Sequence, residues 1–94
     1  MNWIEIIKVR SFSSEEKKKA LKLFSNFSSD GSYKITLYQD HEINTDFIVC
    51  LQWSGLKGKH ITEKLVAALK NYGWISHSIW EPLADLPLIN KEIC

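Results

Sequence analysis

The chain has 94 residues, of which 45% are hydrophobic and 12% aromatic, and this is enough for one domain with a hydrophobic core. Twelve basic and eleven acidic side chains leave a formal net charge of +1, so neither a basic nucleic-acid binder nor an acidic cation buffer is indicated. No run approaches the roughly 18 consecutive apolar residues that a membrane-spanning helix needs, and we expect no membrane association.

The first third of the chain predicts a strand followed by a helix. Residues 2–12 are rich in β-branched and aromatic side chains, which is typical of a strand. Residues 13–27 change to a helical period, and Ser13 with Glu16 has the S-x-x-E spacing of a capping box. One apolar helix face is expected from the spacing of Ala20, Leu23, Phe24 and Phe27. The same segment contains a lysine cluster, Lys17, Lys18, Lys19 and Lys22. Because glutamates stand beside it, the cluster is expected to form a solvated helix face and not a phosphate-binding patch.

The middle of the chain predicts a β-hairpin. The sequence SSDGS at 28–32 has the composition of a turn. Residues 33–41 then alternate, with Tyr33, Ile35 and Leu37 on one side of a strand. The sequence EINT at 42–45 closes the hairpin into a second strand at 46–54.

The last part predicts a helix and a final strand. After the break GLKGK, residues 60–72 place Ile61, Leu65, Ala68, Leu69 and Tyr72 on one helical stripe. Gly73 stands where helices commonly end in the left-handed conformation. Residues 74–82 form the final strand, which Pro82 stops. Residues 1–82 are therefore expected to form the domain, and residues 83–94 a C-terminal tail.

The order strand, helix, strand, strand, helix, strand predicts an α+β, ferredoxin-like βαββαβ fold. Its four-stranded antiparallel sheet carries both helices on one face. Two strands are nevertheless apolar on both of their faces, at Ile4, Ile6, Ile7 and Val9 and at Phe47, Ile48, Val49, Cys50 and Leu51. A second copy of the chain would cover the face that the helices leave open, so we expect a homodimer, with the tail available to clasp it.

The cysteines and histidines do not have the spacing of a metal site. Cys50 lies in an apolar run and Cys94 ends the chain, which suggests no disulfide framework and a reducing cytoplasm. His41, His60 and His77 form no C-x-x-C, H-x-x-x-H or H-E-x-x-H motif, so we expect no metal and no other cofactor. Haem remains compatible with the sequence, because a single histidine can ligate iron.

Two further motifs have ordinary explanations. GLKGKH at 55–60 lies between a strand and a helix, as a phosphate-binding loop does, but it lacks the full G-x-x-x-x-G-K-S/T spacing. We therefore expect Gly55 and Gly58 to be turn residues in a connection between the strand and the helix. Ser76 and Ser78 flank His77, but neighbours on a strand project to opposite faces, so no catalytic triad is indicated.

His77 is the candidate catalytic residue. On a strand it shares one face with Ile75 and Ile79, and partial burial there would favour the neutral imidazole. Such a ring can act as a general base or bind a carbonyl group. The alternative is a core histidine tied to a neighbouring strand.

Four other residues are candidates for ligand binding. Trp53 and Trp80 could line a flat apolar cavity that suits a small aromatic ligand, or they could anchor a dimer interface. Arg10 and Asp46 lie on strands and could face such a cavity as polar groups. A structural ion pair is the alternative role for either of them.

The sequence also resembles a known family. DFIVCLQW in the third strand and LVAALKNYGWISHSIW, from the second helix to the last strand, resemble the antibiotic biosynthesis monooxygenase-like family of dimeric α/β barrels. The resemblance covers most of residues 3–82. It implies a ferredoxin-like protomer with a cavity between sheet and helices. Some members of this superfamily oxidise polycyclic phenols without metal or flavin, others degrade haem, and many small bacterial members have no established activity.

Three functions therefore follow as hypotheses. The first is a dimeric, cofactor-independent monooxygenase or related enzyme that acts on a small aromatic or quinone-like molecule, with His77 as base. The second is a non-catalytic protein that binds a small apolar ligand in the same cavity. The third is a dimer whose cavity is filled by its own side chains and whose partner is another protein.

Overall fold

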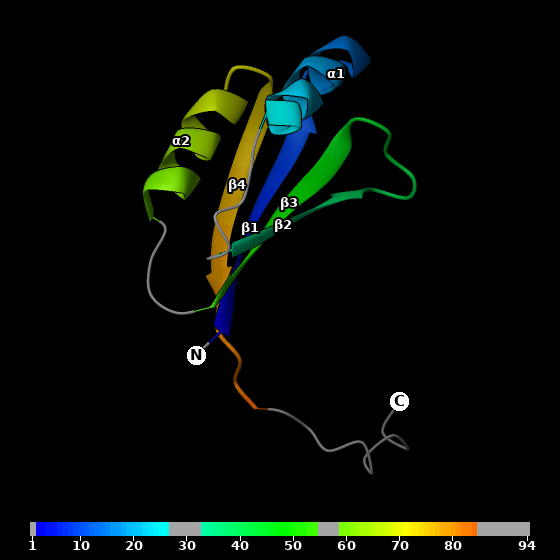
Figure 1. Cartoon of the computed structure of the whole chain (residues 1–94). Coiled ribbons are helices and arrows are strands. Elements are labelled where there is room, and N and C mark those ends of the chain that lie inside the picture. The colour runs from blue at the N-terminus through cyan, green and yellow to red at the C-terminus, as the bar shows by residue number, and fades with distance from the viewer. Residues whose placement is uncertain (1, 27–32, 55–58, 85–94) are drawn as a thin grey trace.

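The computed structural model describes residues 2–26, 33–54 and 59–84, and it has the expected ferredoxin-like architecture. Four strands form one antiparallel sheet in the order β2-β3-β1-β4, and both helices lie on the same side of it (Figure 1). The elements, in chain order, are β1 (Asn2–Ser11), α1 (Ser14–Lys22), the 3-10 helix η1 (Leu23–Asn26), β2 (Tyr33–Gln39), β3 (Asp46–Ser54), α2 (Lys59–Leu69) and β4 (Gly73–Trp80).

The alternation of side chains along the strands separates two faces of the sheet. In β1, Glu5, Ile7 and Val9 are buried against the helices, and this side is called here the helix-facing side. The core on this side is formed by Ile7, Val9, Ala20, Tyr33, Phe47, Val49, Leu51, Trp53, Leu65 and Leu69. The other side is the open face, where no helix of the described chain packs (Figure 1).

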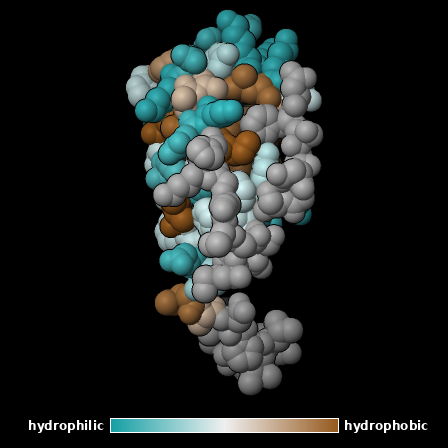
Figure 2. Space-filling view, turned by 60° about the vertical axis from the view of Figure 1, so that its left-hand side comes forward, coloured by the Kyte–Doolittle hydropathy of each residue, from teal (hydrophilic) through white to brown (hydrophobic). Residues whose placement is uncertain are grey.

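The open face carries apolar side chains, as the sequence predicted, next to polar ones such as Lys8, Lys34 and Gln52. Ile4 and Ile6 of β1 and Ile48 and Cys50 of β3 are only half-buried there. Three large aromatic side chains on the same face are exposed, Tyr38, Trp74 and Trp80. By contrast, hydrophilic side chains gather at the end of the molecule that holds α1, with hydrophobic ones between them along its side (Figure 2).

Helix α1 begins where the capping motif predicted. The Ser13 hydroxyl accepts a hydrogen bond from the Glu16 backbone N–H at 3.1 Å. The lysine cluster is not uniformly solvated, because Lys17 is only 8% exposed. Its Nζ donates to the Gln39 Oε1 atom and to the Asn44 carbonyl oxygen, both at 2.6 Å. The prediction of a solvated face was therefore wrong for this lysine, which attaches α1 to the β2–β3 hairpin.

The second helix is shorter than predicted. It ends at Leu69, and the Tyr72 backbone N–H donates to the Leu69 carbonyl oxygen in the turn that follows. Within the described residues, neither helix is long and apolar enough to cross a membrane. The predictions for Phe27, the turn at 28–32, the glycines of 55–58 and the tail residues 85–94, Cys94 included, lie outside the described residues.

Gly73 has a different role from the one predicted. It is the first residue of β4 and pairs with Ser11 of β1, and its backbone does not adopt the left-handed conformation. A Cβ atom at this position would lie 2.4 Å from the Arg10 carbonyl oxygen and 2.8 Å from the Ser11 Cα atom. Both of these neighbours are backbone atoms. Glycine is therefore needed at position 73, because the backbones of β4 and β1 approach each other so closely there.

We expect Gly73→Ala to lower the free energy of unfolding by about 1–3 kcal/mol, the usual cost of forcing an extra methyl group into a packed site. Urea unfolding followed by circular dichroism measures this change. Ser76→Ala is the matched control, because Ser76 is exposed on the open face of the same strand. Equal midpoints for Gly73→Ala and the wild type would contradict the close approach of β4 to β1.

Candidate functional site

A buried carboxylate on the helix-facing side is the centre of the candidate site. Glu5 is only 3% exposed. Its Oε1 atom accepts hydrogen bonds from the Trp53 indole N–H at 2.8 Å and from the Thr62 hydroxyl at 2.7 Å, and its Oε2 atom lies 2.8 Å from His77 Nε2. A buried carboxylate without partners would be strongly disfavoured. These three partners explain why Glu5 can remain in the core.

The sheet register brings these residues together. Glu5 pairs with Leu51 on one side and with Ile79 on the other. Trp53 and His77 each lie two residues from one of these partners, so both side chains project from the same face as Glu5. Thr62 reaches the carboxylate from the N-terminal half of α2. The site is therefore assembled from β1, β3, β4 and α2.

Aromatic rings hold the Trp53 side of the site. The Trp53 ring stacks on Trp3, with centroids 5.6 Å apart and planes inclined by 25°. The Tyr33 ring contacts it from β2, with centroids 4.8 Å apart. Trp53 is itself buried, so its N–H has a fixed direction toward Glu5.

The contact with Glu5 defines the chemistry of His77. A carboxylate whose other oxygen already accepts two hydrogen bonds is best matched by a donor, so we assign the proton of the neutral ring to Nε2. This assignment leaves Nδ1 with a free lone pair. The His77 side chain is 32% exposed, so a molecule outside the core can reach the ring. The arrangement can accept a proton at Nδ1 and stabilise the resulting imidazolium through Glu5.

The structure separates two tryptophans that the sequence analysis placed in one cavity. Trp53 belongs to the Glu5 cluster on the helix-facing side. Trp80 pairs with Ile4 on the open face, and its indole N–H donates to the Ser78 hydroxyl at 2.9 Å. The two rings of the chain therefore do not line the same space, because they leave the sheet in opposite directions.

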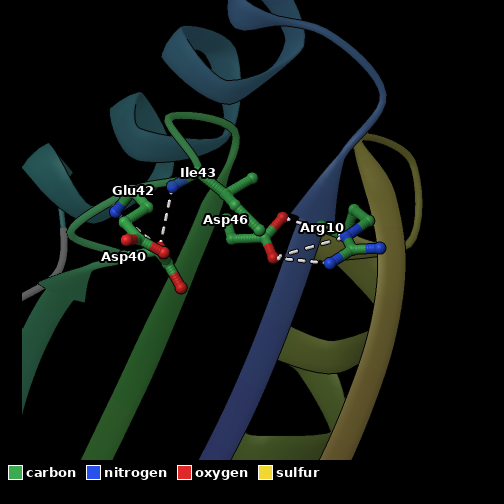
Figure 3. A network of polar contacts seen from close by, with 5 residues as sticks. All are labelled: Arg10, Asp40, Glu42, Ile43 and Asp46. Atoms are coloured by element: carbon green, nitrogen blue, oxygen red, sulfur yellow. Dashed lines mark hydrogen bonds and ion pairs between the residues drawn. The ribbon is translucent and has the colours of Figure 1, made fainter.

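Arg10 and Asp46 also lie on the open face, where they bind each other (Figure 3). Arg10 Nε lies 3.1 Å from Asp46 Oδ1, and Arg10 Nη2 lies 3.0 Å from Asp46 Oδ2. This hydrogen bonding and the charge of Asp46 raise the pKa of Arg10 above its ordinary value. Arg10 and Asp46 therefore form a structural ion pair, which was the alternative to a role in ligand binding. The pair lies on the opposite face of the sheet from His77.

A second carboxylate in Figure 3 shapes the β2–β3 hairpin. Asp40 Oδ1 accepts hydrogen bonds from the backbone N–H groups of Ile43 at 2.7 Å and Glu42 at 2.8 Å. These bonds to the charged form lower the pKa of Asp40 below its ordinary value. The hairpin therefore closes through residues 40–45, close to the predicted turn at 42–45.

Glu5 and Thr62 were not among the site residues predicted from the sequence. The available signal for Glu5 was its position, because Glu5 has the same strand parity as Ile7 and Val9 and must therefore face the core. Thr62 gave no comparable signal. Among the described residues, no group of three or more His, Cys, Asp or Glu side chains is placed to hold a metal ion.

The fold and the site together define a ferredoxin-like α+β domain in which a buried carboxylate contacts a partly exposed imidazole. No protein-family model matches the sequence, and no curated protein matches it significantly. Solved structures do share the fold. One, from Deinococcus radiodurans, is named "putative antibiotic biosynthesis monooxygenase", with a TM-score of 0.66 and 14% identity over 92% of this chain and 97% of that chain.

A protein of the same name from Bordetella bronchiseptica has a TM-score of 0.59 and 8% identity over 88% of this chain and 98% of that chain. At these identities the likeness establishes the fold. The chain thus shares the fold of antibiotic biosynthesis monooxygenase-like structures, in agreement with the resemblance found in the sequence.

Proposed function

We propose that the protein is a homodimeric enzyme, a cofactor-independent monooxygenase or a related enzyme, that acts on a small aromatic or quinone-like molecule with His77 as general base. The observation that carries this proposal is the 2.8 Å contact between His77 Nε2 and the buried Glu5 carboxylate. The name borne by the structural neighbours supports the reaction class, and the partial exposure of His77 supports access by a substrate.

The proposed reaction uses the substrate as the source of electrons. His77 Nδ1 removes the proton of a phenolic hydroxyl, and Glu5 stabilises the imidazolium that forms. The electron-rich phenolate then reduces molecular oxygen. One oxygen atom enters the ring, the other leaves as water, and a phenol with O2 yields a quinone and H2O. No metal or flavin is required for this balance.

Each side chain near His77 has a separate part in the proposal. Ile75 and Ile79 flank the imidazole on the same strand face and provide apolar contacts for an aromatic ring. Trp53 and Thr62 act through Glu5, whose position they hold. Trp53 is in this view a positioning residue.

The proposal includes a cytoplasmic location. Cys50 is a free thiol, and free thiols are typical of proteins in the reducing cytoplasm.

The homodimer follows from the open face. Half-buried isoleucines and three exposed aromatic rings on one side of the sheet form an apolar surface that favours association. A second copy of the chain offers a surface of the same kind, and a two-fold axis would place sheet against sheet. Arg10 and Asp46 lie at one end of this face, where their ion pair can remain at the rim.

We expect His77→Ala to lower the turnover number by about 100-fold or more, because the substrate loses the base that removes its proton. Oxygen uptake and quinone absorbance, measured over a panel of naphthols and hydroxyanthrones, first identify a substrate of the wild type and then compare the variants. His41→Ala is the matched control, because His41 is exposed in the β2–β3 hairpin. Unchanged turnover in His77→Ala would remove this residue from the mechanism. Wild-type binding of the aromatic panel without turnover would instead indicate a non-catalytic binding protein.

A further inference from the structure

A hollow on the open face is separate from the Glu5–His77 site. Its volume is about 280 Å³, and it lies where β1 begins and β4 ends. The lining residues are Trp3, Ile4, Gln52, Trp80, Glu81 and Pro82. The volume is roughly that of nine molecules of liquid water, so a molecule of only several heavy atoms would fill it.

The register explains how the hollow forms. Ile4 pairs with Gln52 of β3 on one side and with Trp80 of β4 on the other, so these three side chains form its floor on the open face. Glu81 and Pro82 follow directly as the chain leaves β4. Trp80 is 56% exposed, and the hydrogen bond to Ser78 uses the only N–H of its ring. Trp80 therefore offers a ligand its aromatic surface and no donor.

The charge of the lining selects the class of ligand. Trp80 contributes the electron-rich face of its indole ring, Glu81 contributes a carboxylate, and none of the six lining residues is basic. The Trp3 ring lies on the helix-facing side, where it stacks on Trp53. An indole face attracts cations through its quadrupole, and a carboxylate adds charge complementarity. The Gln52 side chain supplies a neutral acceptor beside them.

We infer that this hollow binds a small organic ammonium ion. The inference does not rest on the function proposed for His77, because none of the lining residues belongs to the cluster of Glu5, Trp53, Thr62 and His77. A second copy on the open face would cover the hollow, so the binding experiment is repeated across protein concentrations.

The test uses choline and its neutral isostere 3,3-dimethylbutan-1-ol as probes. Each probe is titrated into the full-length ¹⁵N-labelled protein while the indole N–H resonances are recorded, and Trp80→Phe identifies the Trp80 signal. We expect saturable movement of that signal, with choline binding about tenfold more tightly than the neutral isostere. Absence of saturable choline binding at every protein concentration, or equal affinity for the two probes, overturns the inference.

Two substitutions locate the binding energy. Glu81→Gln should weaken choline binding by about tenfold and leave the affinity for the neutral alcohol unchanged. Because Glu81 is exposed, this substitution does not threaten folding. Glu42→Gln is the matched control, since Glu42 is an exposed carboxylate in the β2–β3 hairpin. His77→Ala should leave choline binding intact. Equal choline affinities for Glu81→Gln and Glu42→Gln overturn the assignment of the site.

Discussion

Replacing Trp53 with alanine is expected to lower the free energy of unfolding by about 3–5 kcal/mol, the usual cost of deleting a large buried aromatic side chain. Trp53 is buried between the Trp3 and Tyr33 rings, so its removal leaves a cavity that these neighbours cannot fill. The same change also removes the indole N–H that donates a hydrogen bond to the Glu5 carboxylate. Small domains are stable by only about 5–15 kcal/mol, so the variant should unfold at a much lower urea concentration.

Two further variants separate the causes of this loss. Trp53→Phe keeps most of the ring but removes the N–H that Glu5 accepts, and it should cost about 1–3 kcal/mol. Trp74→Ala deletes a tryptophan that is 64% exposed on the open face, and it should change monomer stability much less. If Trp53→Ala and Trp74→Ala unfold at the same urea concentration, the packing of Trp53 in the core is wrong.

Introducing a charge at the centre of the open face is expected to dissociate the proposed dimer. Ile6 lies between Cys50 and Ser78 in the sheet, so Ile6→Lys would place an ammonium group in the middle of the interface. An unpaired buried charge is strongly disfavoured, and we expect the dimer dissociation constant to rise by about 100-fold or more. Sedimentation equilibrium of the wild type and the variant measures the change.

The control for this experiment is the same substitution away from the interface. Ile43→Lys introduces a lysine in the β2–β3 hairpin, at an already exposed side chain. It should leave the dissociation constant unchanged. A wild-type protein that sediments as a monomer at high concentration would contradict the homodimer directly. A dimer that survives Ile6→Lys would require an interface other than the open face.

The order and type of the elements could be predicted because each has a strong local signal. The period changes from two to 3.6 after Ser13, and the segment at 46–54 matches β3 in both of its bounds. The site could be predicted only in part. His77 was found because it interrupts an apolar strand face, but its partner Glu5 is 72 residues away in the chain. A contact at this distance depends on strand register, which local patterns do not specify.

The remaining differences have physical reasons of the same kind. Trp53 and Trp80 were grouped because both are aromatic, whereas the face of a strand residue depends on its parity and on its neighbours across the sheet. Lys17 was predicted to be solvated from its charged neighbours, yet acceptors from Gln39 and Asn44 hold it in the protein. Gly73 was interpreted from its place after a helix, and the close approach of β1 decides its role instead.

The order of the sheet also has a consequence for how the protein acquires its site during synthesis. Among the described strands β1 is synthesised before the others, but its two neighbours in the sheet are β3 and β4, and β4 is synthesised after the other three. Most pairings of the central strand are therefore long-range, which is a feature of slowly folding topologies. Until β4 is complete, Glu5 has no imidazole partner and one edge of β1 is unpaired. A nascent chain that lacks β4 thus combines an aggregation-prone edge with an incomplete site.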